Sequence, residues 1–460
     1  MTGSTQDTIA AVSTPRGSGG IAVIRISGRD SVPVLTSCFR PKIRKPIEDR
    51  RALHGWIVDS EEPVDEVLVL YFRSPNSYTG EDVIEIHCHG GLFVSERILE
   101  RVVRNGARIA NPGEFTERAF LNGRMDLTQA EAVADLIRAE TEASRRAAAY
   151  QLEGRLYGRI RSIRDELIRL GSLLELELDF SDDEVEFASR EELDALLLSA
   201  QTHLRKLLDS YERGRACREG IRMAIVGPPN VGKSSLLNAL VEKERAIVTD
   251  IPGTTRDVIE ERLDIEGVLF TVSDTAGLRE TADPIEKQGV SRAEKSAEGA
   301  DLILCVLDGS RALSEEEERM INKVREFPAQ KVIVLNKSDL GEKIHDSDLH
   351  VISQEVKRIR LSALTKQGMD DLIDTLKRTA LSGALPHEGE VLLTRERHRE
   401  CIRRVCEHLR EASHSLQEKM SQEFVAVDIR GALDALGEMT GETASDVVLN
   451  KIFSDFCIGK

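Results

Sequence analysis

The middle of the chain contains Gly227-Pro228-Pro229-Asn230-Val231-Gly232-Lys233-Ser234, which matches the pattern G-x-x-x-x-G-K-[ST]. This loop follows an apolar run at residues 222–226 and opens a helical pattern at residues 235–241, the context that a phosphate-binding loop requires. Glycines let backbone N–H groups curl around phosphate oxygens, Lys233 neutralises the phosphates, and Ser234 ligates Mg²⁺. The sequence therefore predicts a nucleoside-triphosphate site on an α/β sheet.

Further elements of a guanine-nucleotide site follow, each after an apolar run. Asp274-Thr275-Ala276-Gly277 is expected to face Mg²⁺ and the γ-phosphate. Asn336-Lys337-Ser338-Asp339 is expected to read the base, because the carboxylate of Asp339 can accept hydrogen bonds from guanine N1–H and the 2-amino group. Adenine offers neither donor, so GTP is preferred over ATP. Ser362-Ala363-Leu364 is expected to brace the base.

The residue after the Asp-x-x-Gly element is Leu278, where many GTPases carry a glutamine that orients the attacking water. An alkyl group cannot position water, so another residue must do so. The charged candidates in the following stretch are Arg279, Glu280, Asp283 and Glu286. Asn230 and the run at residues 249–257 supply neutral oxygens that can surround a monovalent cation. Such a cation would provide the charge that an arginine finger gives elsewhere.

The pattern of apolar residues changes along the chain. Residues 1–120 alternate apolar and polar positions, with frequent Gly and Pro, and predict an α+β domain. Leucines at helical spacing occur both before and after the middle segment, whose continuous apolar runs predict a largely parallel α/β sheet. We expect one helical domain with the α/β domain inserted, since the ends of a compact domain often lie close together; two separate helical domains are the alternative. The expected boundaries are 1–121, 122–216 (helical, first part), 217–382 (GTPase) and 383–460 (helical, second part).

The composition limits the partners and the compartment. The 460 residues carry a net charge of −17, with 80 acidic and 63 basic residues, so an RNA partner is expected at a local patch or through another subunit. Seven cysteines without paired spacing predict reduced thiols in a cytoplasmic protein. No apolar run of about 18 residues occurs, so no membrane span is expected. The first residues lack the pattern of an export or organelle signal.

Other motifs are more specific than the GTPase elements. They are Ile24-Arg25-Ile26-Ser27-Gly28, Tyr78-Thr79-Gly80-Glu81-Asp82, His89-Gly90-Gly91, residues 112–120 (Pro-Gly-Glu-Phe-Thr-Glu-Arg-Ala-Phe) and Phe456-Cys457-Ile458-Gly459-Lys460. Together with Asn230 and the runs at residues 249–257 and 274–279, they make the chain resemble the tRNA-modification GTPase family MnmE, also called TrmE, over essentially its whole length. The first-domain motifs and residues 456–460 distinguish this family from a GTP-dependent ribosome-assembly or signalling switch, which is the alternative function and has no need of them.

The resemblance implies a Ras-like P-loop GTPase domain inserted into an all-helical domain, after an α+β domain of the folate-binding type. It implies a homodimer formed through the first domain, which binds a 5-formyl- or 5,10-methylene-type tetrahydrofolate. It also implies a heterotetramer-type complex with the flavoprotein MnmG. That complex would install a carboxymethylaminomethyl or aminomethyl-type group on C5 of the wobble uridine (U34) of certain tRNAs. Hydrolysis would depend on potassium and on pairing of two GTPase domains. A third reading makes the first domain a folate-binding module and the GTPase purely regulatory.

The resemblance also implies site residues. The GTP-binding residues would be Asn230, Val231, Gly232, Lys233, Ser234, Ser235, Thr249, Asp250, Ile251, Pro252, Gly253, Thr254, Thr255, Asp274, Thr275, Ala276, Gly277, Asn336, Lys337, Ser338, Asp339, Ser362, Ala363 and Leu364. Ser234 and Thr255 would bind Mg²⁺, whereas K⁺ would be held by Asn230, Thr249, Ile251 and Thr254. Glu286 would orient the attacking water and ranks above Glu280 and Asp283.

The folate residues would be Arg25, Glu85, Arg124 and Lys460, with Arg124 standing where some relatives carry lysine. Cys457 is either a reactive thiol or a quiet cysteine. The histidines His54, His87 and His89 have no cysteine or carboxylate spacing that supports a closed zinc site. The run at residues 315–318, after Ser314, predicts a capped helix start with a solvated face.

Overall fold

The computed structural model describes residues 7–179, 189–243, 245–246, 261–265, 267–272, 297–345, 349, 356–381 and 390–460. The chain divides into two compact units. The first contains residues 1–134, 152–183 and 420–460, and the second contains residues 135–151 and 184–419. Within the described residues, none of the helices combines the length and apolar character that a membrane crossing needs.

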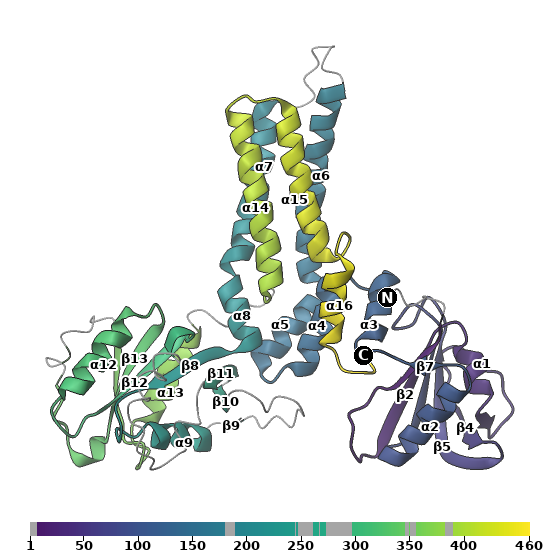
Figure 1. Cartoon of the computed structure of the whole chain (residues 1–460), viewed down its shortest axis with the longest axis horizontal. Coiled ribbons are helices and arrows are strands. Elements are labelled where there is room, and N and C mark those ends of the chain that lie inside the picture. The colour runs from purple at the N-terminus through teal and green to yellow at the C-terminus, as the bar shows by residue number, and fades with distance from the viewer. Residues whose placement is uncertain are drawn as a thin grey trace. The chain divides into compact units, whose positions relative to one another are not determined.

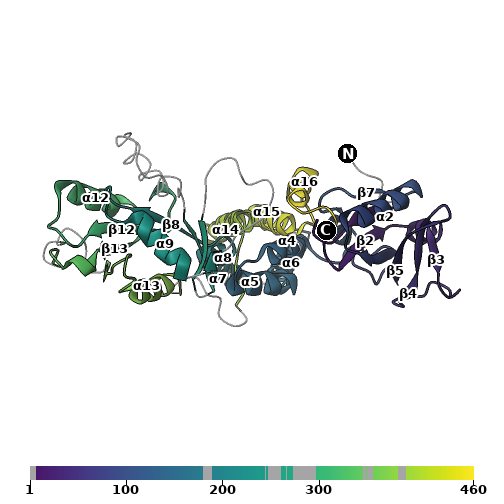
Figure 2. The same ribbon diagram turned by 90° about the horizontal axis from the view of Figure 1, so that it is seen from below.

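The first unit contains a seven-stranded sheet with the order β3-β4-β5-β6-β2-β1-β7. Figure 2 shows the helix α2 beside strands of this sheet. All of its pairings are antiparallel except β1 with β7. Alternating side chains of β2 and β6, such as Ile24 and Ile86, are fully buried and pack with Ile98 of the covering helix α2. The predicted α+β domain is confirmed. Its elements are β1 (Ile9–Val12), β2 (Ile21–Ser27), α1 (Ser31–Thr36), β3 (Phe39–Pro41), β4 (Leu53–Asp59), β5 (Glu62–Phe72), β6 (Val83–His89), α2 (Leu92–Arg104), β7 (Arg108–Ile109) and α3 (Glu114–Leu121).

Helices complete the first unit. The elements are α4 (Leu127–Arg138), which continues into the second unit, α6 (Arg155–Asp179), α15 (Gln422–Thr440) and α16 (Asp446–Ser454). Helices α6 and α15 lie side by side (Figure 1). Their contact is close enough that a Cβ at Gly171 of α6 would lie 3.5 Å from the side chain of Ile429 of α15. Leucines at helical spacing, among them Leu170 and Leu174, are fully buried, as the periodicity predicts.

The C-terminal segment lies against the sheet domain of the first unit. Phe453 and Phe456 pack together, with ring centroids 5.7 Å apart, and join a cluster that includes Phe120. Gly459 adopts a positive φ of 96°, and a Cβ there would lie 2.5 Å from the carbonyl oxygen of Val12. Only glycine fits this close approach. The last residues are therefore held beside the strand β1.

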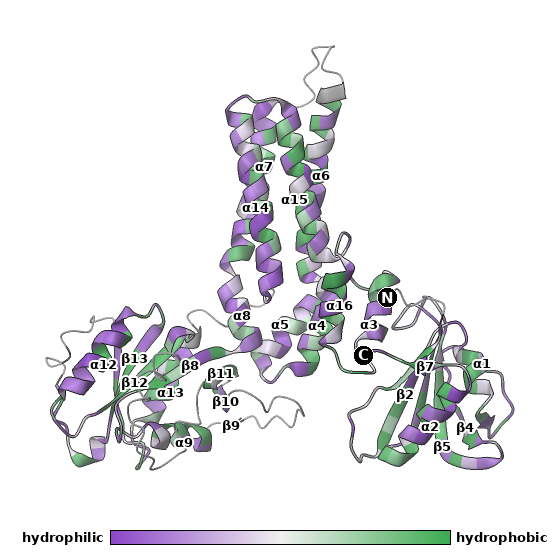
Figure 3. Cartoon of the chain, viewed as in Figure 1, coloured by the Kyte–Doolittle hydropathy of each residue, from purple (hydrophilic) through white to green (hydrophobic). Residues whose placement is uncertain are grey.

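The second unit contains another seven-stranded sheet, with the order β14-β13-β12-β8-β11-β10-β9. The pairings from β14 through β11 are parallel, and β10 pairs antiparallel with β11 and β9. Every residue of β12 is buried, and Figure 3 colours the central strands as hydrophobic, which confirms the predicted parallel α/β sheet. Its elements are β8 (Ile221–Val226), α9 (Lys233–Lys243), β9 (Arg245–Ala246), β10 (Glu261–Ile265), β11 (Val268–Val272), β12 (Leu302–Asp308), α12 (Glu315–Glu326), β13 (Gln330–Asn336), η3 (Ser338–Leu340), β14 (Lys357–Arg360) and α13 (Met369–Leu381).

Four further helices of the second unit lie before and after this sheet domain in the sequence. They are α5 (Glu142–Leu152), α7 (Arg190–Asp209), α8 (Tyr211–Glu219) and α14 (Glu396–Gln417). The chain enters the sheet from α8 and returns before α14. There the N–H of Leu393 donates to Ser210 Oγ at 3.1 Å, and Arg213 forms an ion pair with Glu390. A Cβ at Gly214 would lie 2.1 Å from the carbonyl oxygen of Leu393. Entry and exit are thus adjacent, as an inserted domain requires.

Candidate functional site

The phosphate loop connects β8 to α9 and depends on three special backbone positions. A Cβ at Gly227 would lie 2.3 Å from the carbonyl oxygen of Val306, so glycine is required there. Asn230 and Gly232 have positive φ values of 62° and 95°. Residues of left-handed conformation between right-handed ones are typical of an anion-binding nest, in which successive N–H groups turn to one side. The predicted loop therefore has a backbone that fits a phosphate group.

Lys233 begins α9 and folds back over the loop. Its Nζ donates to the carbonyl oxygens of Gly227 at 2.9 Å and Pro228 at 2.8 Å. Burial lowers the pKa of Lys233, and the more distant carboxylate of Glu316 only partly offsets this effect. A phosphate group beside Lys233 would stabilise its charged form. The site thus offers a partly desolvated cation where the sequence predicts the β- and γ-phosphates.

Asn336 joins the base-reading loop to two other loops. Its buried side chain donates from Nδ2 to the carbonyl oxygen of Val231 at 2.8 Å and accepts at Oδ1 from the N–H of Ala363 at 2.9 Å. A Cβ at Gly232 would lie 2.2 Å from Asn336 Nδ2. The phosphate loop, the Asn-Lys-Ser-Asp element and the Ser-Ala-Leu element therefore form one hydrogen-bonded set, and Asn336 is its link.

The next residues of the base-reading loop differ in their surroundings, since Lys337 pairs with a carboxylate and Asp339 is exposed. Lys337 has a positive φ of 66°, and its Nζ donates to Asp308 Oδ2 at 2.7 Å. Burial alone would raise the pKa of Asp308, but hydrogen bonds from Lys337 and Ser310 lower it below its ordinary value. Asp339 lies exposed on η3, where its carboxylate is accessible to a base.

The run of glutamates at residues 315–318 partly contradicts the solvated face expected from the sequence. Ser314 does cap α12, and Glu317 completes a capping box. Glu317 is nevertheless fully buried, and its Oε1 accepts from the N–H of Asp308 at 3.2 Å and contacts Arg311. The glutamate thereby supports Asp308, which in turn holds Lys337. The other three glutamates of the run are exposed.

Several predicted site residues lie outside the described residues. They are Thr249, Asp250, Ile251, Pro252, Gly253, Thr254, Thr255, Asp274, Thr275, Ala276, Gly277, Leu278, Arg279, Glu280, Asp283 and Glu286. Of the predicted metal ligands, Asn230 and Ser234 are described, and both belong to the phosphate loop region. Elsewhere in the described part of the chain, no group of three or more His, Cys, Asp or Glu side chains is placed to hold a metal ion.

A second set of predicted residues meets in the first unit. Arg25 of β2 lies opposite Glu85 of β6, and its Nε and Nη2 donate to Glu85 Oε1 at 3.0 and 2.8 Å. The guanidinium lies 5.1 Å from the centroid of the Tyr78 ring and 5.7 Å from that of Phe115, within the range of a cation–π contact. The pair is largely buried, with 14% and 18% of the two side chains exposed.

Lys460 belongs to the same set. Burial lowers the pKa of Lys460, the neighbouring charge of Arg25 lowers it further, and Glu85 acts in the opposite direction. The structure thus brings Arg25, Glu85 and Lys460 together. Arg124 is exposed, with its side chain against Gly80, and Cys457 is an exposed free thiol.

A buried ionic network near this set was not predicted. Arg118 of α3, only 4% exposed, contacts Asp7 at 2.7 Å, Glu81 at 3.1 Å and Glu114 at 2.9 Å. Glu114 also pairs with Arg108. The i,i+4 spacing of Glu114 and Arg118 was a local signal for their contact. Nothing in the sequence places Asp7 and Glu81 beside them, because those contacts are non-local.

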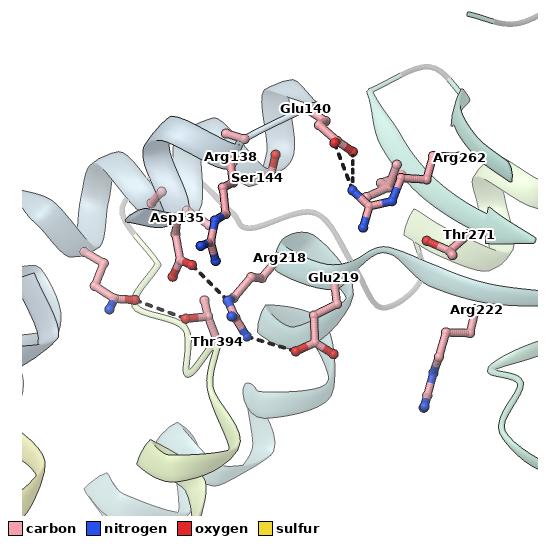
Figure 4. Close-up of a pocket in the computed structure, with 15 residues that line it drawn as sticks. Asp135, Arg138, Glu140, Ser144, Arg218, Glu219, Arg222, Arg262, Thr271 and Thr394 are labelled. Atoms are coloured by element: carbon pink, nitrogen blue, oxygen red, sulfur yellow. Dashed lines mark hydrogen bonds and ion pairs between the residues drawn. The ribbon is translucent and has the colours of Figure 1, made fainter. Parts of the chain in front are cut away.

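The second unit also contains a cavity of about 340 Å³ that the sequence does not predict (Figure 4). Asp135 accepts from Arg218 at 3.0 Å and from Arg395 at 2.7 Å, and Glu140 accepts from Arg262 Nη1 at 2.9 and 3.0 Å. These ion pairs join α4 to α8 and to the chain before α14, and they join the segment after α4 to β10. None of the described residues that line the cavity is a predicted site residue, and its Arg218 and Arg262 face carboxylates. We interpret these contacts as a structural brace.

Comparisons with known proteins show which proteins this chain is similar to. The family model described as the MnmE helical domain matches residues 127–457, and the model described as the GTP-binding protein TrmE N-terminus matches residues 8–124. The tRNA modification GTPase MnmE of Natranaerobius thermophilus is 44% identical, over 99% of this chain and 100% of that protein. The protein of the same name from Symbiobacterium thermophilum is 45% identical over 99% and 100%. Among solved structures, the G domain of the T. maritima FeoB iron transporter is 22% identical, covering 35% of this chain and 98% of that chain with a TM-score of 0.27.

Proposed function

The chain belongs to the MnmE family of tRNA modification GTPases, and from this premise we propose that it modifies C5 of the wobble uridine (U34) in certain tRNAs together with a flavoprotein partner. The product would be a carboxymethylaminomethyl or aminomethyl-type group. The observation that carries this proposal is the cluster of Arg25, Glu85 and Lys460, which a bare GTP-dependent switch does not need.

GTP would bind across the linked loops. Lys233 would neutralise the β- and γ-phosphates, and Asp339 would read the guanine edge. Ser234 and Thr255 would hold Mg²⁺, while Asn230, Thr249, Ile251 and Thr254 would hold K⁺. Glu286 would orient the attacking water. What supports the nucleotide part is the positive φ at Asn230 and Gly232 together with the bond from Asn336 to Val231.

A tetrahydrofolate derivative would bind at the Arg25–Glu85–Lys460 cluster and, when bound, supplies a one-carbon unit. Glu85 would accept hydrogen bonds from the amide and amino edge of the pterin, while Arg25, Arg124 and Lys460 would hold the acceptors and the glutamate tail. The fit is supported by the Nε2 of His87 beside Glu85, which is buried and has no hydrogen-bond partner among the described residues. Cys457 is exposed near the same cluster and stays a candidate thiol.

The family and the net charge of the chain together suggest its macromolecular partners. We propose a homodimer formed through residues 1–121 and a heterotetramer-type complex with the flavoprotein MnmG, in the cytoplasm. With a net charge of −17, this chain is poorly suited to hold tRNA through phosphates alone. The flavoprotein would therefore provide much of the tRNA contact.

Mass analysis of the wobble uridine in tRNA from a deletion strain tests the proposal. We expect the modified nucleoside to disappear, to return with the wild-type gene, and to stay absent with Glu85→Ala. Full modification in the deletion strain, with altered ribosome profiles instead, would favour the ribosome-assembly alternative.

A further inference from the structure

His87 lies on β6, two residues after Glu85 and on the same face of the sheet. It opposes Val23 of β2 and Leu68 of β5. Its Nε2 is buried and has no hydrogen-bond partner among the described residues. A buried polar atom without a partner is uncommon in folded proteins, and it calls for an explanation such as a ligand contact.

The position of this nitrogen relative to Glu85 gives that explanation. Arg25 contacts only Oε1 of Glu85, through two nitrogens. Glu85 Oε2 lies 3.6 Å from His87 Nε2, which is beyond hydrogen-bond distance. An oxygen acceptor and a ring nitrogen thus lie next to each other without bonding to each other. Two adjacent polar atoms of one ligand can engage both.

The charges around His87 argue against a metal ion as the ligand and in favour of a neutral molecule. The cations Arg25 and Lys460 belong to the same cluster as Glu85, so a metal cation would be repelled. A neutral ligand that offers one donor and one neighbouring acceptor suits the pair. An amide edge, with N–H beside C=O, has that pattern, and it occurs in the pyrimidinone ring of a pterin.

We propose that His87 is a specificity residue of this site, donating from Nε2 to the C4 carbonyl oxygen of the pterin while Glu85 Oε2 accepts from the adjoining ring N–H. This inference rests on the proposed folate function. It assigns part of the recognition of a 4-oxo ring, as opposed to a 4-amino ring, to this side chain. In a 4-amino ring, C4 presents a donor to the donor of His87, and the adjoining ring nitrogen carries no hydrogen for Glu85, so both side chains lose their partners.

Calorimetry with 5-formyltetrahydrofolate and with a 2,4-diaminopteridine antifolate tests the assignment on the full-length protein. We expect the wild type to prefer the 4-oxo ligand. His87→Leu should bind that ligand roughly 10-fold more weakly, the loss expected for one neutral hydrogen bond. The affinity for the 4-amino ligand should change little, so the ratio between the affinities for the 4-oxo and the 4-amino ligand should fall. His87→Gln keeps an N–H donor and should restore most of the affinity.

His89→Leu is the matched control, because His89 lies on the same strand but is 72% exposed and pairs with Asp65. It should leave both affinities unchanged. Wild-type binding that His87→Leu does not weaken would overturn the role of His87 and leave the folate site standing. Absence of wild-type binding to both ligands would remove the folate site and this inference with it. Should His87→Leu unfold, equal wild-type affinities for the two ligands would by themselves refute the assignment.

Discussion

The Nδ2 of Asn336 donates a hydrogen bond of 2.8 Å to the carbonyl oxygen of Val231, which lies 105 residues earlier in the chain. The loop that reads the base is thereby tied to the loop that holds the phosphates. This connection means that a change in the base-reading element can alter phosphate binding without touching a phosphate.

Asn336→Asp should remove one of the two hydrogen bonds of this side chain and keep the other. The carboxylate keeps an acceptor for the N–H of Ala363 but loses the donor to Val231. We expect the nucleotide domain to lose about 1–3 kcal/mol of unfolding free energy, because the buried Val231 carbonyl is left unpaired. Asn336→Ala also leaves the Ala363 N–H without its partner, but Asn336→Asp should lose more, because its buried carboxylate faces the Val231 carbonyl oxygen without a donor between them. Chemical denaturation of the three proteins measures this order; an Asn336→Asp variant more stable than Asn336→Ala would contradict it.

Asp339→Asn should change base preference. The amide donor of asparagine repels guanine N1–H but complements the C2 carbonyl of xanthine. The affinity for GTP should therefore fall roughly 10- to 150-fold, and the affinity for xanthosine triphosphate should rise. Competition with a fluorescent nucleotide gives both affinities. An unchanged ratio of the two would remove the role assigned to the exposed carboxylate of Asp339.

Glu286→Ala should slow GTP turnover by about 10²–10⁴-fold with little change in GTP affinity, because the residue would act in the transition state. Turnover of wild type and variant is measured in potassium and in sodium. We expect the wild type to be faster in potassium. Equal wild-type rates in the two salts would argue against the cation cage, and a fully active variant in potassium would argue against Glu286.

Glu85→Ala should abolish folate binding while the fold is kept, because Arg25 and Lys460 cannot replace an acceptor. Glu66→Ala is the control, since Glu66 pairs with His54 at 2.9 Å on another part of the same sheet. If the Arg25–Glu85 pair were only a structural ion pair, Glu85→Ala would lower stability and leave the folate affinity intact. Calorimetry with 5-formyltetrahydrofolate distinguishes these cases.

The pair of Asp308 and Lys337 should make stability depend on acid pH. The pKa of Asp308 is lowered in the folded protein from an ordinary value of 3.8. Its contribution is therefore fully present above that value and is lost as pH falls through the folded pKa, below about pH 4. Asp308→Asn should flatten this part of the stability curve. Denaturation between pH 2.5 and about 6 tests it; identical slopes for both proteins would exclude the contribution.

The second sheet and the phosphate loop could be predicted because their signals are local. A buried parallel strand appears as a continuous apolar run, as in β12, and the loop has a fixed glycine spacing. The roles of Arg118 and Asn336 could not be predicted in full, because their partners Asp7, Glu81 and Val231 lie far away in sequence. Glu317 was missed for another reason: a run of glutamates looks solvated until the neighbouring N–H of Asp308 is known.

The close approach of Gly459 to Val12 means that the C-terminal segment must have a defined length. Phe453 and Phe456 fix where that segment starts, and the glycine fixes where it passes the strand β1. A single residue inserted between Phe456 and Gly459 would shift the register by up to about 3.3–3.6 Å. Lys460 would then miss Arg25 and Glu85 although its own side chain is unchanged. The length of this segment is therefore as much a part of the cluster as the identity of its residues.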